Sequence, residues 1–261
     1  MASTFLVNSA AVSATASTNS TDSTNGLDHI DPSRIRAAVF DYGGVLIEGG
    51  PSEVAAFGGK TGLSEDIWRP LRREFFGNDG IWARLERGEV PYSDFTAALR
   101  RAIHDAGGTV SEQQAESFMG SPDPMGQRAR LRPQMLDAVR RIRAVMPTAL
   151  LTNNVREWRA EWERVLDPAS LFDVIIDSSE VGARKPEPRI YEITREKLGV
   201  AHDEIFFVDD IGQNLKAARA LGWNTLLFRE TAEVLPVLEA LVTARQRELT
   251  GKPAGESRQK S

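Results

Sequence analysis

The sequence contains no cysteine in its 261 residues. This absence excludes disulfide bonds, thiolate zinc sites, cysteine nucleophiles and thiol redox switches. Histidine is also scarce, because only His29, His104 and His202 are present, and their spacing matches no histidine metal site. Carboxylates are therefore the first candidates for catalysis and metal binding. A chain without thiols is also compatible with a reducing compartment, and we expect the protein to be cytoplasmic.

Long hydrophobic runs are missing as well. No stretch approaches the roughly 20 apolar residues of a membrane-spanning helix. A secretory signal needs a basic start followed by at least about seven apolar residues. The first arginine is Arg34, and the apolar run at 5–7 is too short. We therefore expect neither export nor a membrane partner.

The chain also lacks an excess of positive charge. Its 32 Lys and Arg residues are outnumbered by 37 Asp and Glu residues, for a net charge of −5. Such a chain does not attract a polyphosphate backbone, so nucleic acid is not an expected partner. The 41% hydrophobic and 26% charged residues are typical of a globular protein. Oligomeric state is not predicted by any of these features.

Short β-rich runs alternate with amphipathic segments between two polar ends. Residues 1–33 and 249–261 are expected to be disordered tails. The alternation predicts an α/β fold, with a three-layer, Rossmann-like parallel sheet covered by helices. The predicted strands are 37–42, 148–152, 173–177, 205–209 and 225–228, and the predicted helices are 133–145, 155–166, 187–198, 212–221 and 231–248.

Residues 51–125, between the first and second strands, have helical patterns alone. We predict helices at 64–76, 80–87, 92–106 and 111–119, which form an inserted all-α cap. The core is then made of residues 34–50 and 126–248. Because ligands of open α/β sheets bind at the carboxyl ends of the strands, the cap is expected to cover that edge. Trp68 and Trp82 are expected in the core of the cap.

Polar residues follow three of the predicted strands. Adjacent carboxylates at a strand end repel one another unless a cation compensates them, which indicates a hard divalent metal such as Mg²⁺. Lys185 lies in a loop before Pro186 and Pro188, where it can neutralise an incoming anion. This set is suited to the transfer of an anionic group to a carboxylate. The strand-end residues are Asp41, Gly43, Gly44, Thr152, Asn153, Asp209, Asp210 and Asn214.

Each of these residues taken alone also has a structural explanation. Asp41 could make a turn, and one of Asp209 and Asp210 is expected to cap the helix that follows. Lys185 alone could be a solvated charge. The sequence from Thr152 could begin a helix, which is compatible with phosphate binding because helix N-termini attract anions.

Together, the segments resemble the four motifs of the haloacid dehalogenase superfamily, subfamily I with a helical C1 cap, which consists mainly of phosphohydrolases. The resemblance covers about residues 35–230. It is strongest to the group containing the N-terminal phosphatase domain of soluble epoxide hydrolase and the N-terminal domain of some acyl-CoA dehydrogenases. The segments that carry it are Glu86-Arg-Gly-Glu, Lys185-Pro-Glu-Pro-Arg-Ile-Tyr and Val208-Asp-Asp-Ile-Gly-Gln-Asn-Leu-Lys-Ala-Ala-Arg.

The resemblance implies a role for each strand-end residue. Asp41 resembles the nucleophile that forms an aspartyl-phosphate, and Lys185 the residue that steadies nucleophile and phosphate. The implied Mg²⁺ ligands are Asp41, Asp210 and the backbone carbonyl of Gly43, supported by Asp209 and Asn214. The implied phosphate-binding residues are Thr152, Asn153 and Gly44.

The sequence departs from this superfamily at Gly43. Most of its phosphatases have there a second Asp that protonates the leaving group, although some sugar-1-phosphate phosphatases similar to this chain also have glycine. Glycine transfers no proton, and general acid–base catalysis contributes typically 10²–10⁴-fold. Glu48 or an acid from the cap is a possible replacement.

The residues and the resemblance therefore predict a Mg²⁺-dependent phosphatase of a small phosphorylated metabolite. One alternative is a carbon–halogen hydrolase, which also uses an aspartate nucleophile without the second Asp but needs no metal. The other alternative is a degenerate relative that binds a phosphorylated ligand without turnover. Substrate identity is not predicted.

Overall fold

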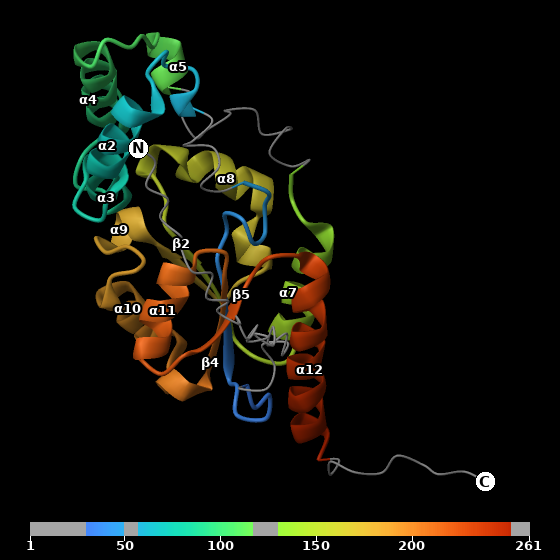
Figure 1. Cartoon of the computed structure of the whole chain (residues 1–261). Helices are drawn as coiled ribbons and strands as arrows, with labels where there is room; N and C mark the ends of the chain where they lie inside the picture. Colours follow the sequence, from blue (N-terminus) through green and yellow to red (C-terminus); the bar gives the residue numbers. More distant parts are fainter. Residues whose placement is uncertain (1–29, 50–56, 117–129, 252–261) are drawn as a thin grey trace, which may run out of the picture.

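A five-stranded parallel sheet forms the centre of the protein. The computed structural model describes residues 30–49, 57–116 and 130–251 (Figure 1). The strand order is β3-β2-β1-β4-β5, so β1 is central and has β2 and β4 as neighbours. The strands are β1 (Ala37–Phe40), β2 (Thr148–Thr152), β3 (Val174–Asp177), β4 (Ile205–Asp209) and β5 (Asn224–Leu227). The predicted parallel sheet is confirmed.

The three central strands are buried along their whole length. A parallel strand covered on both faces needs apolar side chains at successive positions, as in Ile205–Val208. In β1, Phe40 packs into the cluster on one face of the sheet and Val39 into the cluster on the other. The strand ends at Phe40, two residues before its predicted end, and the chain turns at the glycines that follow.

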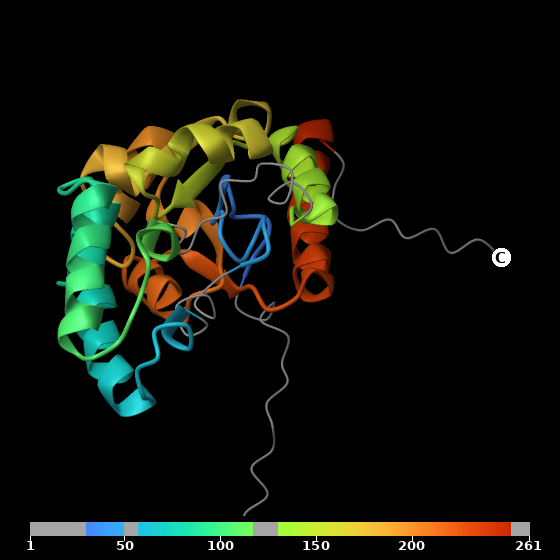
Figure 2. The same ribbon diagram turned by 90° about the horizontal axis from the view of Figure 1, so that it is seen from above.

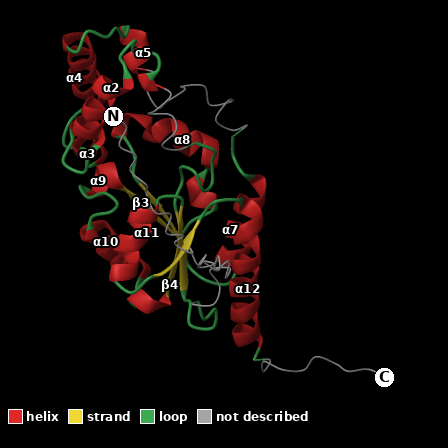
Figure 3. Ribbon diagram, viewed as in Figure 1, coloured by secondary structure: helices red, strands yellow, loops and turns green. Residues whose placement is uncertain are grey.

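Helices cover both faces of the sheet, which gives the predicted three layers (Figures 2 and 3). On one face, Met135, Trp162 and Leu238 belong to a hydrophobic cluster with Phe40. On the other face, Ile190 and Leu215 pack with Val39. The first face is covered by α7 (Pro133–Arg143), α8 (Arg159–Leu166) and α12 (Thr231–Thr250), and the second by α10 (Pro188–Leu198) and α11 (Gly212–Ala220).

Residues 57–116, between β1 and β2, contain helices and no strand (Figure 3). Their apolar side chains form a separate hydrophobic cluster that includes Trp68 and Trp82, as the sequence predicted. The ends of the predicted 51–125 segment lie partly outside the described residues, and its boundaries stay a prediction. The helices are α2 (Glu65–Phe76), α3 (Ile81–Glu86), α4 (Tyr92–Asp105) and α5 (Glu112–Glu116); we call the segment that they form the cap.

The cap packs on the core close to the carboxyl end of β2. Val155 and Trp158 of the core join the hydrophobic cluster of the cap. The ring of Trp158 lies 6.0 Å from Trp82 and 5.3 Å from Tyr92, measured between centroids. The cap thereby lies beside the edge of the sheet at which the central strands end (Figure 1).

Several helix boundaries differ from the sequence-based expectation. The predicted helix at 155–166 begins as a 3₁₀ turn (Arg156–Trp158) before α8, and α12 continues to Thr250, two residues further than predicted. The short helix α9 (Ser178–Val181) was not predicted, because four residues show no helical period. Asp177 begins it by accepting a 3.0 Å hydrogen bond from the Ser179 amide. Two further 3₁₀ turns span Pro168–Ser170 and His202–Glu204.

No helix within the described ranges combines the length and the apolar character needed to cross a membrane.

Candidate active site

Three carboxylates meet where β1 and β4 end. Asp41 directly follows β1, Asp209 is the last residue of β4, and Asp210 follows it. Each of the three offers an oxygen within 4.8 Å of the other two. This proximity follows from the topology, because β1 and β4 are adjacent parallel strands whose carboxyl ends lie at one edge.

Lys185 is inserted between two of these carboxylates. Its Nζ lies 2.7 Å from Asp41 Oδ1 and 2.7 Å from Asp209 Oδ2, and the side chain is 1% exposed. Burial alone would lower the pKa of this lysine, but the charges of Asp209 and Asp41 outweigh burial and raise it. The lysine is therefore a cation at neutral pH. It is not the solvated charge that the loop sequence alone would also have allowed.

The carboxylate of Asp209 is fully engaged by the protein. Besides Lys185, it accepts a 2.7 Å hydrogen bond from the Ile211 amide and two of 3.1 Å from Asn214 Nδ2. The bond to Ile211 forms a turn just before α11, but the N-cap residue of that helix is Ile211 and no side chain caps it, so the predicted cap by Asp209 or Asp210 is wrong. Tyr191 Oη donates to the Asn214 carbonyl at 2.9 Å, so Asn214 is itself anchored. Asp209 and Asn214 together hold Lys185 in place.

Asp41 is buried but keeps one oxygen available. Oδ1 accepts hydrogen bonds from Lys185 Nζ and from the Tyr42 amide, each of 2.7 Å. Oδ2 has no hydrogen-bond partner among the described residues. Burial, opposed by the charge of Lys185 and reinforced by the charges of Asp209 and Asp210, raises the pKa of Asp41 to about 8. A divalent cation would relieve the electrostatic repulsion among these three carboxylates.

Gly44 is required by the position of Asp210. A Cβ atom at Gly44 would lie 2.2 Å from Asp210 Oδ2, and its φ of +75° is in the left-handed region that favours glycine. Asp210 is half-buried, and burial followed by the charge of Asp209 raises its pKa to about 6. The structure thus places Gly44 against the acid cluster.

Gly43 faces a different environment. A Cβ atom added there would meet no atom within 4 Å, so the backbone leaves room for a side chain. Glu48, considered as a replacement acid, is 65% exposed and lies 3.5 Å from Arg132. Its carboxylate is not one of the three that cluster.

Asn153 holds the backbone of the catalytic-lysine candidate. Its Nδ2 donates to the Lys185 carbonyl at 2.9 Å, and its Oδ1 accepts from the Lys185 amide at 2.8 Å. The Asn153 side chain is therefore bound within the protein, and the phosphate-binding role implied for Asn153 stays a prediction. Thr152 lies beside it and is 4% exposed, and its hydroxyl makes only a long 3.4 Å contact to the Asn153 carbonyl.

Glu86 reaches the site from the cap, although sequence reasoning gave it no site role. Its Oε2 lies 2.5 Å from Arg184 Nε and 3.5 Å from Asn153 Nδ2. Burial raises its pKa, while Arg184 opposes that effect. The only sequence signal was its place in the segment 86–89, which contributes to the family resemblance but does not reveal its partners.

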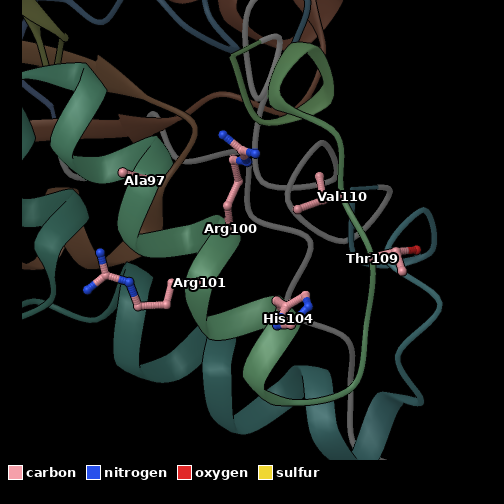
Figure 4. A pocket seen from close by; sticks show the side chains of 6 residues that line it. All are labelled: Ala97, Arg100, Arg101, His104, Thr109 and Val110. Carbon is pink, nitrogen blue, oxygen red and sulfur yellow. The ribbon is translucent and has the colours of Figure 1, made fainter.

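A cavity of about 480 Å³ lies elsewhere, along α4 of the cap (Figure 4). None of the strand-end residues lines it. Its lining side chains are Ala97, Arg100, Arg101, His104, Thr109 and Val110.

Known relatives share most of this chain. The pig bifunctional epoxide hydrolase 2 is 32% identical over 78% of the chain, which spans 38% of that protein. The phosphoglycolate phosphatase of Escherichia coli K12 is 25% identical over 72% of the chain and 79% of its own length. The chain therefore corresponds to well under half of the epoxide hydrolase and to most of the phosphatase.

A solved structure has the same fold. It is a HAD family enzyme from Bacteroides thetaiotaomicron in complex with magnesium and inorganic phosphate. The match covers 76% of this chain and 96% of that one, with a TM-score of 0.54 and 24% sequence identity. In addition, the sequence-family model of the haloacid dehalogenase-like hydrolases matches residues 35–222 of this chain. The site geometry, the fold and this match together establish that the chain is a member of the haloacid dehalogenase-like hydrolase family.

Proposed function

We propose that this hydrolase is a Mg²⁺-dependent phosphatase that cleaves a small phosphorylated metabolite through an aspartyl-phosphate on Asp41. The observation that carries the proposal is the contact of the buried Lys185 ammonium with Asp41, beside two further carboxylates. Phosphoryl transfer depends mainly on positioning and charge compensation, which this arrangement supplies.

The acid cluster fits a magnesium ion. Three carboxylates face one lysine, and burial together with the neighbouring negative charges raises the pKa values of Asp41 and Asp210. Hard oxygen ligands are the ones that Mg²⁺ prefers. We assign the ion to Asp41, Asp210 and the Gly43 carbonyl, and leave Asp209 out because its oxygens are occupied by Lys185, Ile211 and Asn214. A bound Mg²⁺ neutralises charge on the transferring phosphoryl group.

The residues of the chain then account for both half-reactions. Asp41 Oδ2 attacks phosphorus, the bond from phosphorus to the ester oxygen breaks, and the leaving oxygen takes a proton from solvent. Water next attacks phosphorus and loses a proton to solvent, the bond from phosphorus to Asp41 Oδ2 breaks, and inorganic phosphate and the Asp41 carboxylate are released. Lys185 remains protonated throughout and offsets the negative charge that gathers between nucleophile and phosphate. Thr152 and backbone groups of the Asn153 and Gly44 loops are assigned to the phosphoryl oxygens.

Similarity to a phosphoglycolate phosphatase and to a magnesium- and phosphate-bound enzyme supports this assignment. A small phosphorylated substrate is also consistent with a net charge of −5, because only the local Lys185 and the metal ion would attract an anion. We propose a cytoplasmic location on the sequence grounds given above.

The glycine at position 43, where most phosphatases of the family have a second Asp, is also compatible with two other functions. A carbon–halogen hydrolase would use the same nucleophile on a haloacid, but it would leave the acid cluster without a purpose. A ligand-binding protein without turnover would explain why Gly43 replaces the second Asp. It would not explain why Asp41 is held beside Lys185 with its Oδ2 left without a hydrogen-bond partner among the described residues. The three-carboxylate cluster therefore favours the phosphatase.

The decisive experiment is hydrolysis of 4-nitrophenyl phosphate and of a phosphometabolite panel, with Mg²⁺ and with a chelator. We expect turnover that requires Mg²⁺ and falls by about 10³-fold or more in Asp41→Asn, which removes the nucleophile. Equal rates for the two proteins would overturn the mechanism. Halide release from a haloacid in the presence of chelator would support the dehalogenase, and ligand-induced stabilisation without turnover across the panel would support the binding protein.

A further inference from the structure

A chain of contacts runs from the cap to the nucleophile. Glu86 at the end of α3 contacts Asn153, Asn153 clamps the backbone of Lys185, and the Lys185 ammonium contacts Asp41. We infer that Glu86 is a positioning residue through which the seated cap fixes Lys185 for phosphoryl transfer. This inference rests on the proposed phosphatase function.

Glu86 is well anchored at the boundary between cap and core. Glu86 is 7% exposed, and its carboxylate accepts from Arg184 Nε at 2.5 Å, with further hydrogen bonding to Trp82 of the same helix. A buried carboxylate with several donors is held in one orientation, because losing any of them would leave a buried charge poorly compensated. Glu86 Oε2 also accepts from Asn153 Nδ2 at 3.5 Å. Because the Glu86 carboxylate is held in place, this contact restrains the Asn153 side chain.

Asn153 passes this restraint on to Lys185. Its side chain is hydrogen-bonded to both the backbone N–H and the backbone carbonyl of Lys185. It therefore fixes the two peptide groups on either side of the Lys185 Cα atom. Glu86 also engages the side chain of Arg184, the residue directly before Lys185. The cap carboxylate thus restrains the lysine loop at two neighbouring points. A shift of about 1 Å in a catalytic group costs up to 10²-fold in rate, so such restraints matter.

The loop after α3 is fastened to the core independently of Glu86. Arg87 Nη1 lies 2.8 Å from Glu187 Oε1 at the start of α10. At Gly88 the two backbones approach so closely that a Cβ atom would lie 2.3 Å from the Ser179 carbonyl oxygen. The adjacent Arg87–Glu187 ion pair also joins cap and core, and Glu187 accepts a 3.2 Å hydrogen bond from the Arg184 amide, but neither residue contacts Asn153. Arg87→Ala is therefore the control for a cap contact that reaches the lysine loop without Asn153.

The test compares Glu86→Ala, Glu86→Gln and Arg87→Ala with the wild-type protein. We measure kcat and KM for 4-nitrophenyl phosphate with Mg²⁺. We expect Glu86→Ala to lower kcat by about tenfold or more with KM changed less than about twofold, since it misplaces Lys185 without removing a substrate contact. Glu86→Gln retains an acceptor oxygen and should recover most of kcat. Arg87→Ala should stay close to the wild-type kcat.

Hydrogen exchange at the Lys185 amide gives a readout that does not depend on turnover; the Arg184 amide is left out because it donates to Glu187, the partner of Arg87. The Lys185 amide donates to Asn153, so Glu86→Ala should accelerate its exchange while Arg87→Ala should not. Equal effects of Glu86→Ala and Arg87→Ala on both readouts would overturn the inference, because Glu86 would then only attach the cap to the core. Faster exchange in Glu86→Ala, combined with a wild-type protein that hydrolyses no phosphate ester, would uphold the coupling and reject the phosphatase. If Glu86→Ala does not fold, Glu86→Gln and Glu86→Asp decide by the same two measurements.

Discussion

The side chains of Lys185 and Asp41 form a buried ion pair with 2.7 Å between Nζ and Oδ1. Asp209 contacts the same ammonium at the same distance, so one cation separates two carboxylates that would otherwise repel each other in a medium with little water. The lysine thus stabilises the folded site, and it leaves Asp41 Oδ2 without a hydrogen-bond partner among the described residues, as the proposed nucleophilic role requires. Both effects can be tested with one substitution.

Lys185→Met should destabilise the protein and abolish phosphatase activity. Removing one partner from a buried ion pair costs about 3–5 kcal/mol, because the remaining charges lose their compensation. Chemical denaturation at pH 9 without metal, above the pKa of about 8 that the fold gives Asp41, measures this loss. Lys197→Met, the same change at an exposed position of α10, should alter stability by no more than about 0.5 kcal/mol. Equal stabilities of the two variants would contradict the buried pairing.

The gathering of the strand-end residues was predictable from the sequence. Asp41 and Asp209 each end a run of apolar residues long enough for a buried strand, and parallel strands bring their carboxyl ends to one edge. Neither conclusion requires knowledge of side-chain contacts. The alternation of strands and helices likewise placed both helical layers.

The partners of Asn153 and Glu86 could not be predicted in the same way. Asn153 lies 32 residues from Lys185, and Glu86 lies 67 residues from Asn153 and 98 from Arg184. Their contacts depend on how the cap is seated on the core, which hydrophobic periodicity does not describe. The phosphate-binding role predicted for Asn153 did not reveal that its side chain is hydrogen-bonded to the Lys185 backbone.

Gly44→Ala should disrupt the metal site. An alanine there would bring Cβ to 2.2 Å from Asp210 Oδ2 and would adopt a φ of +75°. Gly199→Ala is the matched control, because Gly199 has a φ of +69° but no atom within 4 Å of an added Cβ. Both variants should lose about 1–2 kcal/mol from the left-handed backbone, but only Gly44→Ala should also lose Mg²⁺-dependent activity. Normal Mg²⁺ activation of Gly44→Ala would refute the close approach to Asp210.

Gly43→Asp should create the missing general acid. The added side chain meets no atom within 4 Å of its Cβ, so the backbone accommodates it. We expect kcat/KM to rise by about 10–10²-fold for an alkyl phosphate, whose leaving group needs a proton, and much less for 4-nitrophenyl phosphate. Gly43→Asn has nearly the same shape without the transferable proton and should give no such gain. A similar gain in both variants would assign the effect to packing rather than to proton transfer.

The stability of the metal-free protein should fall as pH rises from about 4 to about 8. The pKa of Asp41 is raised from 3.8 to about 8 in the fold, so over this interval the native state holds a proton that the unfolded chain has lost. Deprotonation therefore favours unfolding, and Mg²⁺ should offset this loss most strongly at the alkaline end, where it no longer competes with protons. Thermal unfolding at pH 5 and pH 8, with and without Mg²⁺, measures both effects. Asp41→Asn removes this titrating group and should flatten the pH dependence of the metal-free melting temperature. An unchanged slope in that variant, or a Mg²⁺ stabilisation that is larger at pH 5, would show that Asp41 is not the group that links protons to metal binding.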